Sequence, residues 1–487
     1  MLTPLLDSLI FFALTTPAAG FVGRKIGHEK TAVAAYVTSA LIILLLFTGL
    51  YGSGFLRTEV TLAAYGGPST PEGVSVETDM LTAFMTMLFL GIGVLTSVFS
   101  VQEIGRDNVT GYYTVLLGMI TAMVGVVSSG DLFTLFIFWE AMCICSYTLV
   151  AFKKGKWEAI EASYKYLIMS SAGSITILFG LSFLYGLTGT LNITYLTLSL
   201  ANAQTNPVTY IALLTLMVGF GLQAGMFPFH TWLPDAHMAA PSAVSAVLSG
   251  IMVKTGVYGL IRVLLTVFTP FYGSWQFSLA LFAVLTMFVG NFSALLQDDL
   301  KRLLAYSTIA NTGYILLGVA IGTHRALAGS LFHVFNHAIV KAMLFMCAGI
   351  FIKSARTRSL KDLAGIRRSM PVTGTIFIIG ALSMTGLPFL NIFWGELMII
   401  QAGWEANLGL LSLLMVINLV FSAAYCLRMI QAVGLKRQTS VSKKAKEAPL
   451  LTLTPIVVLV VLSVVVGICP APFQTLVEAV AQVLPSV

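Results

Sequence analysis

Residues 326–352 read ALAGSLFHVFNHAIVKAMLFMCAGIFI. The run is long enough to cross a bilayer, because about 20 apolar residues in a helix span its hydrocarbon core. Three ionisable residues interrupt it, His333, His337 and Lys341, and their spacing places all three on one helix face. A charge at the bilayer centre costs about 2.5–3.5 kcal/mol on the insertion scale. The run therefore predicts a transmembrane helix with a functional polar face.

The rest of the chain has the same character. Of its 487 residues, 57% are hydrophobic and 10% are charged, whereas a soluble domain is about 25% charged. The mean hydropathy is +0.92. We expect an all-α polytopic membrane protein with about fourteen transmembrane helices. The expected spans are 5–23, 32–52, 80–101, 110–128, 131–151, 161–186, 208–227, 241–268, 276–296, 302–322, 326–352, 372–403, 407–434 and 450–470.

The charges of the loops predict the orientation. Basic residues gather in alternate loops, and the loops between them carry only Arg57 and Arg325. Since basic loops stay in the cytoplasm, both termini are expected outside. The clusters are Arg24/Lys25/Lys30, Arg106, Lys153/Lys154/Lys156, Lys301/Arg302, Lys353/Arg356/Arg358/Lys361/Arg367/Arg368 and Lys436/Arg437/Lys443/Lys444/Lys446. The longest loop without a basic cluster is acidic and expected outside, with Glu59, Glu72, Glu77 and Asp79.

Two of the expected spans look broken by proline: the seventh runs into Pro228, and the twelfth contains Pro388. A proline in an apolar helix frees backbone groups, which must find partners in a cavity or in the protein interior. Broken helices in corresponding places favour two five-helix repeats, which are inverted because they enter the membrane from opposite sides. The expected division is 1–108 for three N-terminal helices, 109–270 and 271–435 for the two halves, and 436–487 for a basic loop, the last helix and a short tail.

Other ionisable residues inside the expected spans include Glu140, Lys165, Lys254 and Glu396. Such residues are rare in membranes and usually mark ion pathways. The histidine and lysine column can pass protons through water, because histidine titrates near neutrality. Glu140 and Lys165 are on neighbouring spans and could form an ion pair whose opening changes the proton affinity of nearby groups.

A structural interpretation of these residues competes with the functional one. One intramembrane charge can form a structural pair between helices, and one histidine is often only a hydrogen-bonded core residue. Five spans that carry such residues favour transport. Asp235 and His237 lie near a cytoplasmic loop and are expected only to cap or gate.

No cofactor or metal site is expected in this chain. The five cysteines form no CxxC pair and lie in apolar stretches, where cysteine behaves as a small hydrophobe. The net charge of +7 follows from the cytoplasmic loops and favours anionic lipid, so no nucleic acid is implied.

Several motifs closely resemble the hallmark of the antiporter-like subunits of respiratory complex I, Mrp sodium/proton antiporters and membrane-bound hydrogenases and sulfane reductases. These motifs are FPFHTWLPDAH at 227–237, APS at 240–242, VKTGVY at 253–258, QDDLKRLLAYST at 297–308 and the His333/His337/Lys341 column. The resemblance covers nearly the whole chain. It implies fourteen helices with two inverted five-helix repeats.

The resemblance also implies roles for single residues. Glu140 is similar to the family's glutamate on the fifth span, and Lys165 to its lysine on the sixth. Lys254 resembles the bridging lysine of the eighth span, and Lys341 the central lysine of the second half. Glu396 occupies the terminal site of the twelfth span, which is glutamate in the M-type subunit of complex I and lysine in several other members.

The chain departs from the family pattern at two positions. The family usually has a lysine seven residues before the motif histidine His230, where this chain has Gln223. Glutamine forms hydrogen bonds but carries no titrating proton. Either Lys165 and Lys254 replace the missing lysine, or the first half conducts poorly, or it serves a cation instead. The second departure is Asn311, where M-type relatives tend to have histidine.

These observations predict an ion-translocating, antiporter-like subunit of a multisubunit complex in a prokaryotic cell membrane, carrying protons or sodium ions. Expected partners are other antiporter-like and small membrane subunits, and a peripheral redox arm with iron–sulfur clusters. No redox centre is visible in this chain. The alternatives are an M-type subunit of NADH:quinone oxidoreductase or F420H2 dehydrogenase, a structural subunit that has lost transport, and a stand-alone solute carrier.

Overall fold

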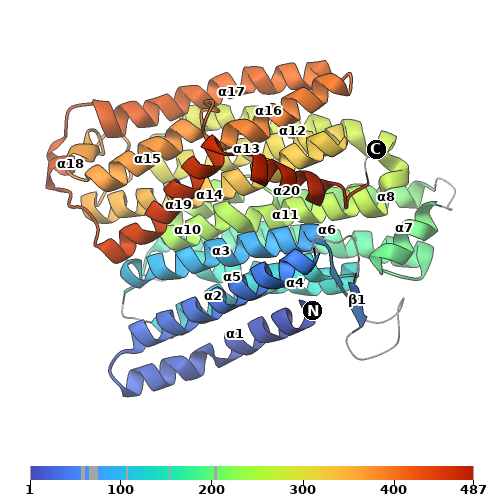
Figure 1. The fold of residues 1–487 in the computed structure, drawn as a ribbon, viewed down its shortest axis with the longest axis horizontal. Helices are drawn as coiled ribbons and strands as arrows, with labels where there is room; N and C mark the ends of the chain where they lie inside the picture. The colour runs from blue at the N-terminus through green and yellow to red at the C-terminus, as the bar shows by residue number, and fades with distance from the viewer. Residues whose placement is uncertain are drawn as a thin grey trace.

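The computed structural model describes residues 2–55, 61–64, 75–105, 108–152, 155–201 and 206–485. Several loop charges used for the orientation lie outside the described residues, namely Arg57, Glu59, Glu72, Arg106, Lys153 and Lys154. In Figure 1 most helices run side by side along the long axis of the molecule, as expected for a bundle that crosses a membrane.

The first half of the chain forms helices of very different lengths. They are α1 (Leu2–Lys25), α2 (Glu29–Phe55), α3 (Met80–Glu103), α4 (Val109–Ser128), α5 (Leu132–Val150), α6 (Trp157–Thr188), α7 (Ile193–Ala201), α8 (Pro207–Gln223), α9 (Trp232–Ala239), α10 (Ser242–Val247) and α11 (Val253–Arg262). Helix α7 lies between two spans, and the hydropathy pattern does not predict it.

The second half continues the bundle. Its helices are α12 (Tyr272–Leu295), α13 (Leu300–Ile321), α14 (His324–Ala355), α15 (Pro371–Ser383), α16 (Asn391–Glu405), α17 (Gly409–Ile430), α18 (Ser440–Lys444), α19 (Leu450–Ile468) and α20 (Ala471–Ala481). Twelve helical segments among the described residues are long and apolar enough to span a membrane, and α8 and α15 are shorter apolar helices. The chain is thus a multi-span membrane protein, and the number fourteen stays a prediction.

Both expected helix breaks are present. Helix α8 ends at Gln223, and the chain makes turns until α9 begins at Trp232. Helix α15 ends at Ser383, and α16 begins at Asn391. Glycines with positive φ occupy both breaks, Gly225 at 71° and Gly386 at 69°, a conformation that glycine adopts without steric cost.

The eighth span is one helical run with two π-helical turns. A π-turn at Leu248–Met252 joins α10 to α11, and another follows at Val263–Val267. Such turns often mark functional sites in helices, and the first of them directly precedes Lys254.

A small antiparallel sheet adds to the all-α architecture. Strand β1 (Thr61–Ala64) pairs with β2 (Ser75–Thr78), with Thr61 opposite Thr78 and Leu62 opposite Glu77. We call the end of the bundle that carries these strands the strand face. Both termini lie toward it in Figure 1, and α18 lies at the other end. That end also carries Lys156, Lys301, Arg302 and Arg358, and we call it the basic face.

The innermost spans are the ones that carry the ionisable column. The most apolar stretch of 18 residues in Ser242–Val267 is entirely buried inside the bundle. In the corresponding stretches of Leu300–Ile321 and His324–Ala355, 94% and 78% of the residues are buried. The corresponding share is 28% for α1 and 33% for α17. Lys254 on α11 and the column residues His333, His337 and Lys341 on α14 therefore face protein and not lipid.

Candidate functional site

The site is centred on an amine and an imidazole from two different helices. Lys254 on α11 places its Nζ 2.7 Å from Nδ1 of His337 on α14, and both side chains are fully buried. The same amine donates to the carbonyl of Ser249, at 2.6 Å, in the preceding π-turn. A nitrogen accepts a hydrogen bond only where it carries no proton, so one nitrogen of this pair is the donor and the other is an unprotonated acceptor. One proton therefore lies between the two bases.

A second chain of hydrogen bonds runs beside this pair. His333 stacks near His337, with ring centroids 5.9 Å apart, and its Nε2 donates to Oδ1 of Asn311 at 3.0 Å. Asn311 donates to the carbonyl of Ser307 at 2.8 Å, and Lys341 donates to the hydroxyl of Ser307. The predicted column is thus assembled, and Asn311 connects it to α13.

Glu396 lies at the second break, as predicted. It is 2% exposed, and its Oε2 sits against the turn at Gly386, where an added Cβ would lie 2.5 Å from the oxygen. Neighbouring Gly395 lets α16 approach α14, because a Cβ there would lie 2.8 Å from the backbone nitrogen of His333. Cys426 of α17 lies near both Lys341 and Glu396. These contacts bring the acid to the end of the column.

In the first half, Gln223 replaces a titrating group with a neutral one. Its side chain is 1% exposed and donates to the hydroxyl of Tyr166 at 2.9 Å. That hydroxyl is 2.8 Å from Oγ of Ser146, and Tyr166 stacks on Trp232 with centroids 4.1 Å apart. The position is therefore a neutral hydrogen-bonded cluster.

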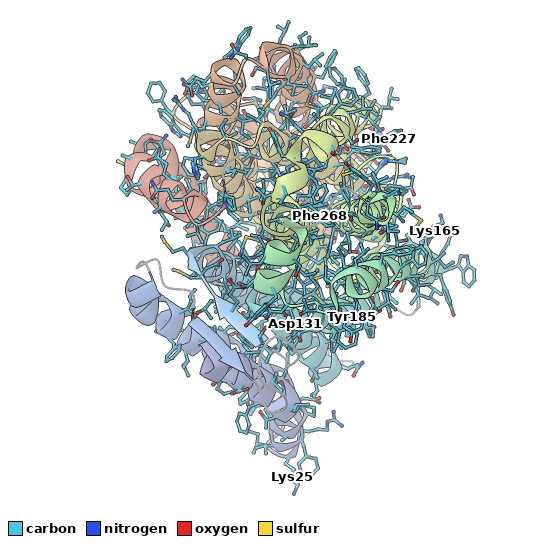
Figure 2. The ribbon with its side chains drawn as sticks, turned by 90° about the vertical axis from the view of Figure 1, so that its right-hand side faces the viewer. Lys25, Asp131, Lys165, Tyr185, Phe227 and Phe268 are labelled. Carbon is cyan, nitrogen blue, oxygen red and sulfur yellow. The ribbon has the colours of Figure 1, made fainter. Side chains whose placement is uncertain are left out.

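The predicted ion pair between Glu140 and Lys165 does not form. Lys165 bonds to Glu161 at 2.9 Å and to Asp235 at 3.1 Å, and its side chain is 51% exposed. Figure 2 places Lys165 at the rim of the bundle. Glu140 is partly buried, and its Oε1 has no hydrogen-bond partner among the described residues. Helix rotation explains the error, since Lys165 lies on the outward face of α6.

His237 lies near the connection between α9 and α10, and its side chain is buried in the interior. It is fully buried on α9 and stacks on Phe345 with ring centroids 4.7 Å apart. Neither ring nitrogen has a hydrogen-bond partner in the described part of the chain. Its imidazole interacts electrostatically with Lys301, Lys341 and Lys254, so it lies between the column and the basic face.

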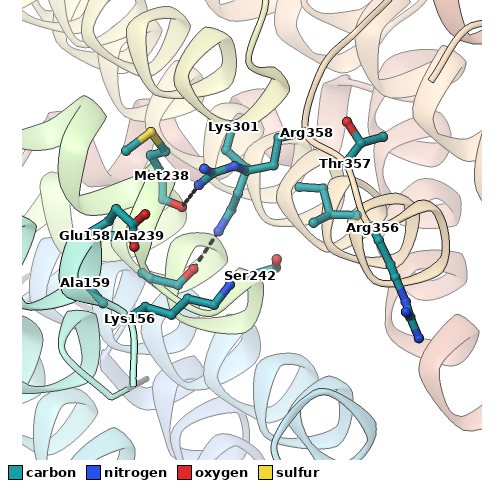
Figure 3. Close-up of a pocket in the computed structure, with 12 residues that line it drawn as sticks. Lys156, Glu158, Ala159, Met238, Ala239, Ser242, Lys301, Arg356, Thr357 and Arg358 are labelled. Carbon is teal, nitrogen blue, oxygen red and sulfur yellow. Dashed lines mark hydrogen bonds between the residues drawn. The ribbon is translucent and has the colours of Figure 1, made fainter. Parts of the chain in front are cut away.

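A basic cavity of about 430 Å³ opens at this face (Figure 3). Among its lining residues are Lys156, Lys301 and Arg358, with Glu158 as a lining acid. Lys301 donates to the carbonyl of Ala240 at 2.7 Å, and Arg358 donates to the carbonyl of Met238 at 3.1 Å. The cavity therefore meets the connection between α9 and α10, close to His237.

The fold also contains a buried charge that sequence reasoning missed. Arg262 ends α11 and is 4% exposed, with Nη2 2.6 Å from Oδ2 of Asp79. A signal was available, because Arg262 lies inside the apolar run 241–268.

Comparison with known proteins agrees with this architecture. The profile of the family described as NADH:quinone oxidoreductase/Mrp antiporter, TM, matches residues 129–422. The D-type subunit of the Na(+)/H(+) antiporter of Alkalihalophilus pseudofirmus is 30% identical over 462 residues, which cover 92% of this chain and 90% of that protein. The N-type subunit of the F(420)H(2) dehydrogenase of Methanosarcina mazei is 30% identical over 480 residues, covering 92% and 97%.

A solved structure shares the whole fold. A chain of the membrane-bound sulfane sulfur reductase, an archaeal respiratory membrane complex, superposes with a TM-score of 0.90 at 27% identity, covering 98% of this chain and 96% of that one. The chain therefore belongs to the NADH:quinone oxidoreductase/Mrp antiporter transmembrane family, as one of its antiporter-like membrane subunits.

Proposed function

We propose that this chain carries protons across the membrane as an antiporter-like subunit of a multisubunit prokaryotic complex. The supporting observation is the 2.7 Å contact between Lys254 and His337. Two buried nitrogen bases that share one proton can exchange it with little movement, and the charge of one controls the protonation of the other. The pair is thus suited to passing protons and to coupling their passage to neighbouring charges.

The chemistry of the centre favours protons over sodium. Sodium is a hard cation and needs oxygen ligands, whereas the four titratable side chains of the centre, those of Lys254, His333, His337 and Lys341, carry nitrogen. Sodium is the second candidate ion, favoured by the name of the Na(+)/H(+) antiporter relative. Oxygen groups for it exist in the first half, at Glu140 and Gln223.

The main proposed route runs through the second half of the chain. It joins Lys254 and His337 to His333, Lys341 and Glu396 through hydrogen-bonded side chains and water. Glu140 would belong to a branch in the first half, which Gln223 interrupts. Lys165 is exposed, so it is not one of the buried residues of the proposed route.

The partners are proposed from the relatives. Other antiporter-like and small membrane subunits would flank this chain, as it resembles subunits of an Na(+)/H(+) antiporter and of respiratory complexes. A peripheral redox arm with iron–sulfur clusters would supply electrons, because this chain is expected to hold no redox cofactor. An M-type subunit of NADH:quinone oxidoreductase or F420H2 dehydrogenase is the alternative, favoured by Glu396. The positive-inside rule supports a cytoplasmic basic face and external termini.

The Lys341→Ala variant of the purified complex, reconstituted in vesicles, tests this function. We expect proton transport to fall by about 100-fold, the scale of a lost acid–base group. Lys361→Ala is the matched control, since Lys361 is exposed on the basic face, and it should transport normally. Unchanged transport in Lys341→Ala would instead support a structural subunit that has lost ion conduction.

A further inference from the structure

A buried ion pair at the strand face has no part in the route described so far. Nη2 of Arg262, at the end of α11, lies 2.6 Å from Oδ2 of Asp79, and the two side chains are 5% and 4% exposed. Asp79 also caps α3 by accepting from the backbone nitrogen of Thr82 at 2.7 Å. The pair therefore joins the eighth span to the start of the third.

Arg262 also continues a polar column that begins in the centre of the membrane. Lys254, Tyr258 and Arg262 recur every four residues on α11, so they share one helix face. Nε of Arg262 donates to the hydroxyl of Tyr258 at 3.0 Å, and that hydroxyl donates to the carbonyl of Val127 at 2.8 Å. The column leads from the shared proton at Lys254 to the strand face.

A second carboxylate stands beside the ion pair. Glu77 on β2 is 8% exposed. It interacts electrostatically with Arg262 and Asp79. Burial raises the pKa of the Glu77 carboxyl, although Arg262 opposes this shift. Burial also disfavours ionised Asp79, but Arg262 and the bonds from Thr82 outweigh it and lower the Asp79 pKa.

Two neighbouring acids whose pKa values are shifted in opposite directions often divide the work of a proton site. In the described part of the chain, two further acids, Asp131 and Asp7, lie on elements that contact β2. Asp131, at the start of α5, accepts from the backbone nitrogens of Ser75 at 3.2 Å and Thr134 at 2.7 Å. Asp7 on α1, which packs against β2, is exposed. Figure 2 looks onto this end and shows Asp131 beside the strands.

We propose that Glu77, Asp79 and Arg262 form the release site at which protons leave the buried route toward the strand face. This inference rests on the proposed function. Glu77 is the group that carries the proton, and the Arg262–Asp79 pair is a fixed charge barrier that positions it.

The transfer is a simple proton exchange. A proton that reaches the Tyr258 end of the column adds to the Glu77 carboxylate and forms an O–H bond. That bond then breaks to water at the strand face, which restores the carboxylate. The charge of Arg262 favours the ionised acid and so promotes release, and it repels cations that approach from outside. The buried hydroxyls of Thr86 on α3 and Thr255 on α11 have no partner among the described residues, and such groups normally bind water.

A purely structural ion pair would leave Glu77 without a role. The test therefore uses Glu77→Gln, which keeps the shape and removes the titrating proton, in the intact complex in vesicles with separately buffered sides. We expect transport to fall about tenfold or more. The dependence of the rate on pH at the strand-face side should disappear, while the dependence at the basic-face side is retained.

Glu405→Gln is the matched control, because Glu405 is an acid with an arginine partner, Arg325, but is exposed. It should leave both pH profiles unchanged. Asp79→Asn keeps the helix cap and leaves the charge of Arg262 to act on Glu77 alone. The Glu77 carboxylate should then accept protons from the column less readily, so proton uptake becomes the slow step and transport should fall as well.

The outcomes separate this inference from the function on which it rests. Loss of transport in Lys341→Ala together with an unchanged rate and pH profile in Glu77→Gln would overturn the release site alone. Normal transport in Lys341→Ala would overturn the proposed function itself.

Discussion

Lys254 and His337 are 83 residues apart in the chain, and their side-chain nitrogens are 2.7 Å apart in the fold. Lys254 follows a π-turn on α11, and His337 is on the longest buried helix of the second half, α14. Each half therefore supplies one of the two bases. The contact links the halves through a single proton, which is the physical form that coupling between them would take.

The two bases should behave as one unit. Lys254→Met and His337→Phe each remove one holder of the shared proton, so either should lower proton transport by about 100-fold. The double variant should be no worse than the more severe single one, because groups that act together are strongly non-additive. Transport rates of complexes with equal subunit content measure this. If the double variant instead lost transport by the product of the two single losses, the two residues would hold separate protons.

Gln223→Lys tests whether the first half can conduct. The new amine would lie beside the hydroxyl of Tyr166, which now accepts from Gln223, and would restore a titrating group to the interrupted branch. We expect a changed number of ions moved per turnover, at a stability cost of about 3 kcal/mol for an intramembrane charge. Gln223→Met is the control for shape. A folded Gln223→Lys complex with unaltered ion coupling would show that this branch is closed.

Lys165 should matter much less than Lys254. Its side chain is 51% exposed and bonds to two acids at the rim of the bundle, and exposed pairs contribute less than about 1 kcal/mol. Lys165→Gln should therefore keep transport within about twofold of wild type, while Lys254→Gln loses about 100-fold. Vesicle assays on both variants decide the point. Equal losses would place Lys165 back in the ion route.

Gly395→Ala should disturb the contact between α14 and α16. The added Cβ would lie 2.8 Å from the backbone nitrogen of His333, and overpacking of this kind costs about 1–3 kcal/mol. Gly186→Ala is a suitable control, because a Cβ there meets nothing within 4 Å. Thermal unfolding in detergent should show a lower midpoint for Gly395→Ala only. An unchanged midpoint would mean that the helices can separate at no cost.

Much of the architecture could be predicted because it depends on local sequence. Apolar runs report which segments are long enough to cross a bilayer, and Pro228 and Pro388 mark both helix breaks correctly. The column at His333, His337 and Lys341 follows from helical periodicity alone. The two strands and α7 escaped prediction, since elements of four and nine residues are too short to show a clear period.

The errors concern direction around a helix. Hydropathy shows that Lys165 belongs to an apolar run, but it does not show which way the side chain points. In the fold Lys165 lies on the outward face of α6 and pairs with Asp235 at the rim of the bundle. Arg262 lies in an apolar run, and its partner Asp79 comes from the start of another helix, far away in the chain. The sequence places His237 near a loop, and only the fold shows that it packs against Phe345 and is completely buried.

The order of amino acids is enough to show that this chain crosses a membrane many times and carries ionisable groups into it. The reason is that a polar group in hydrocarbon costs free energy, so the segments that cross the membrane must be apolar almost throughout. Which of these groups meet is a property of the tertiary fold alone. Lys254 reaches His337, Arg262 reaches Asp79, and Lys165 misses Glu140. Contacts between distant segments depend on how helices rotate and pack against one another, and no local stretch of sequence contains that information.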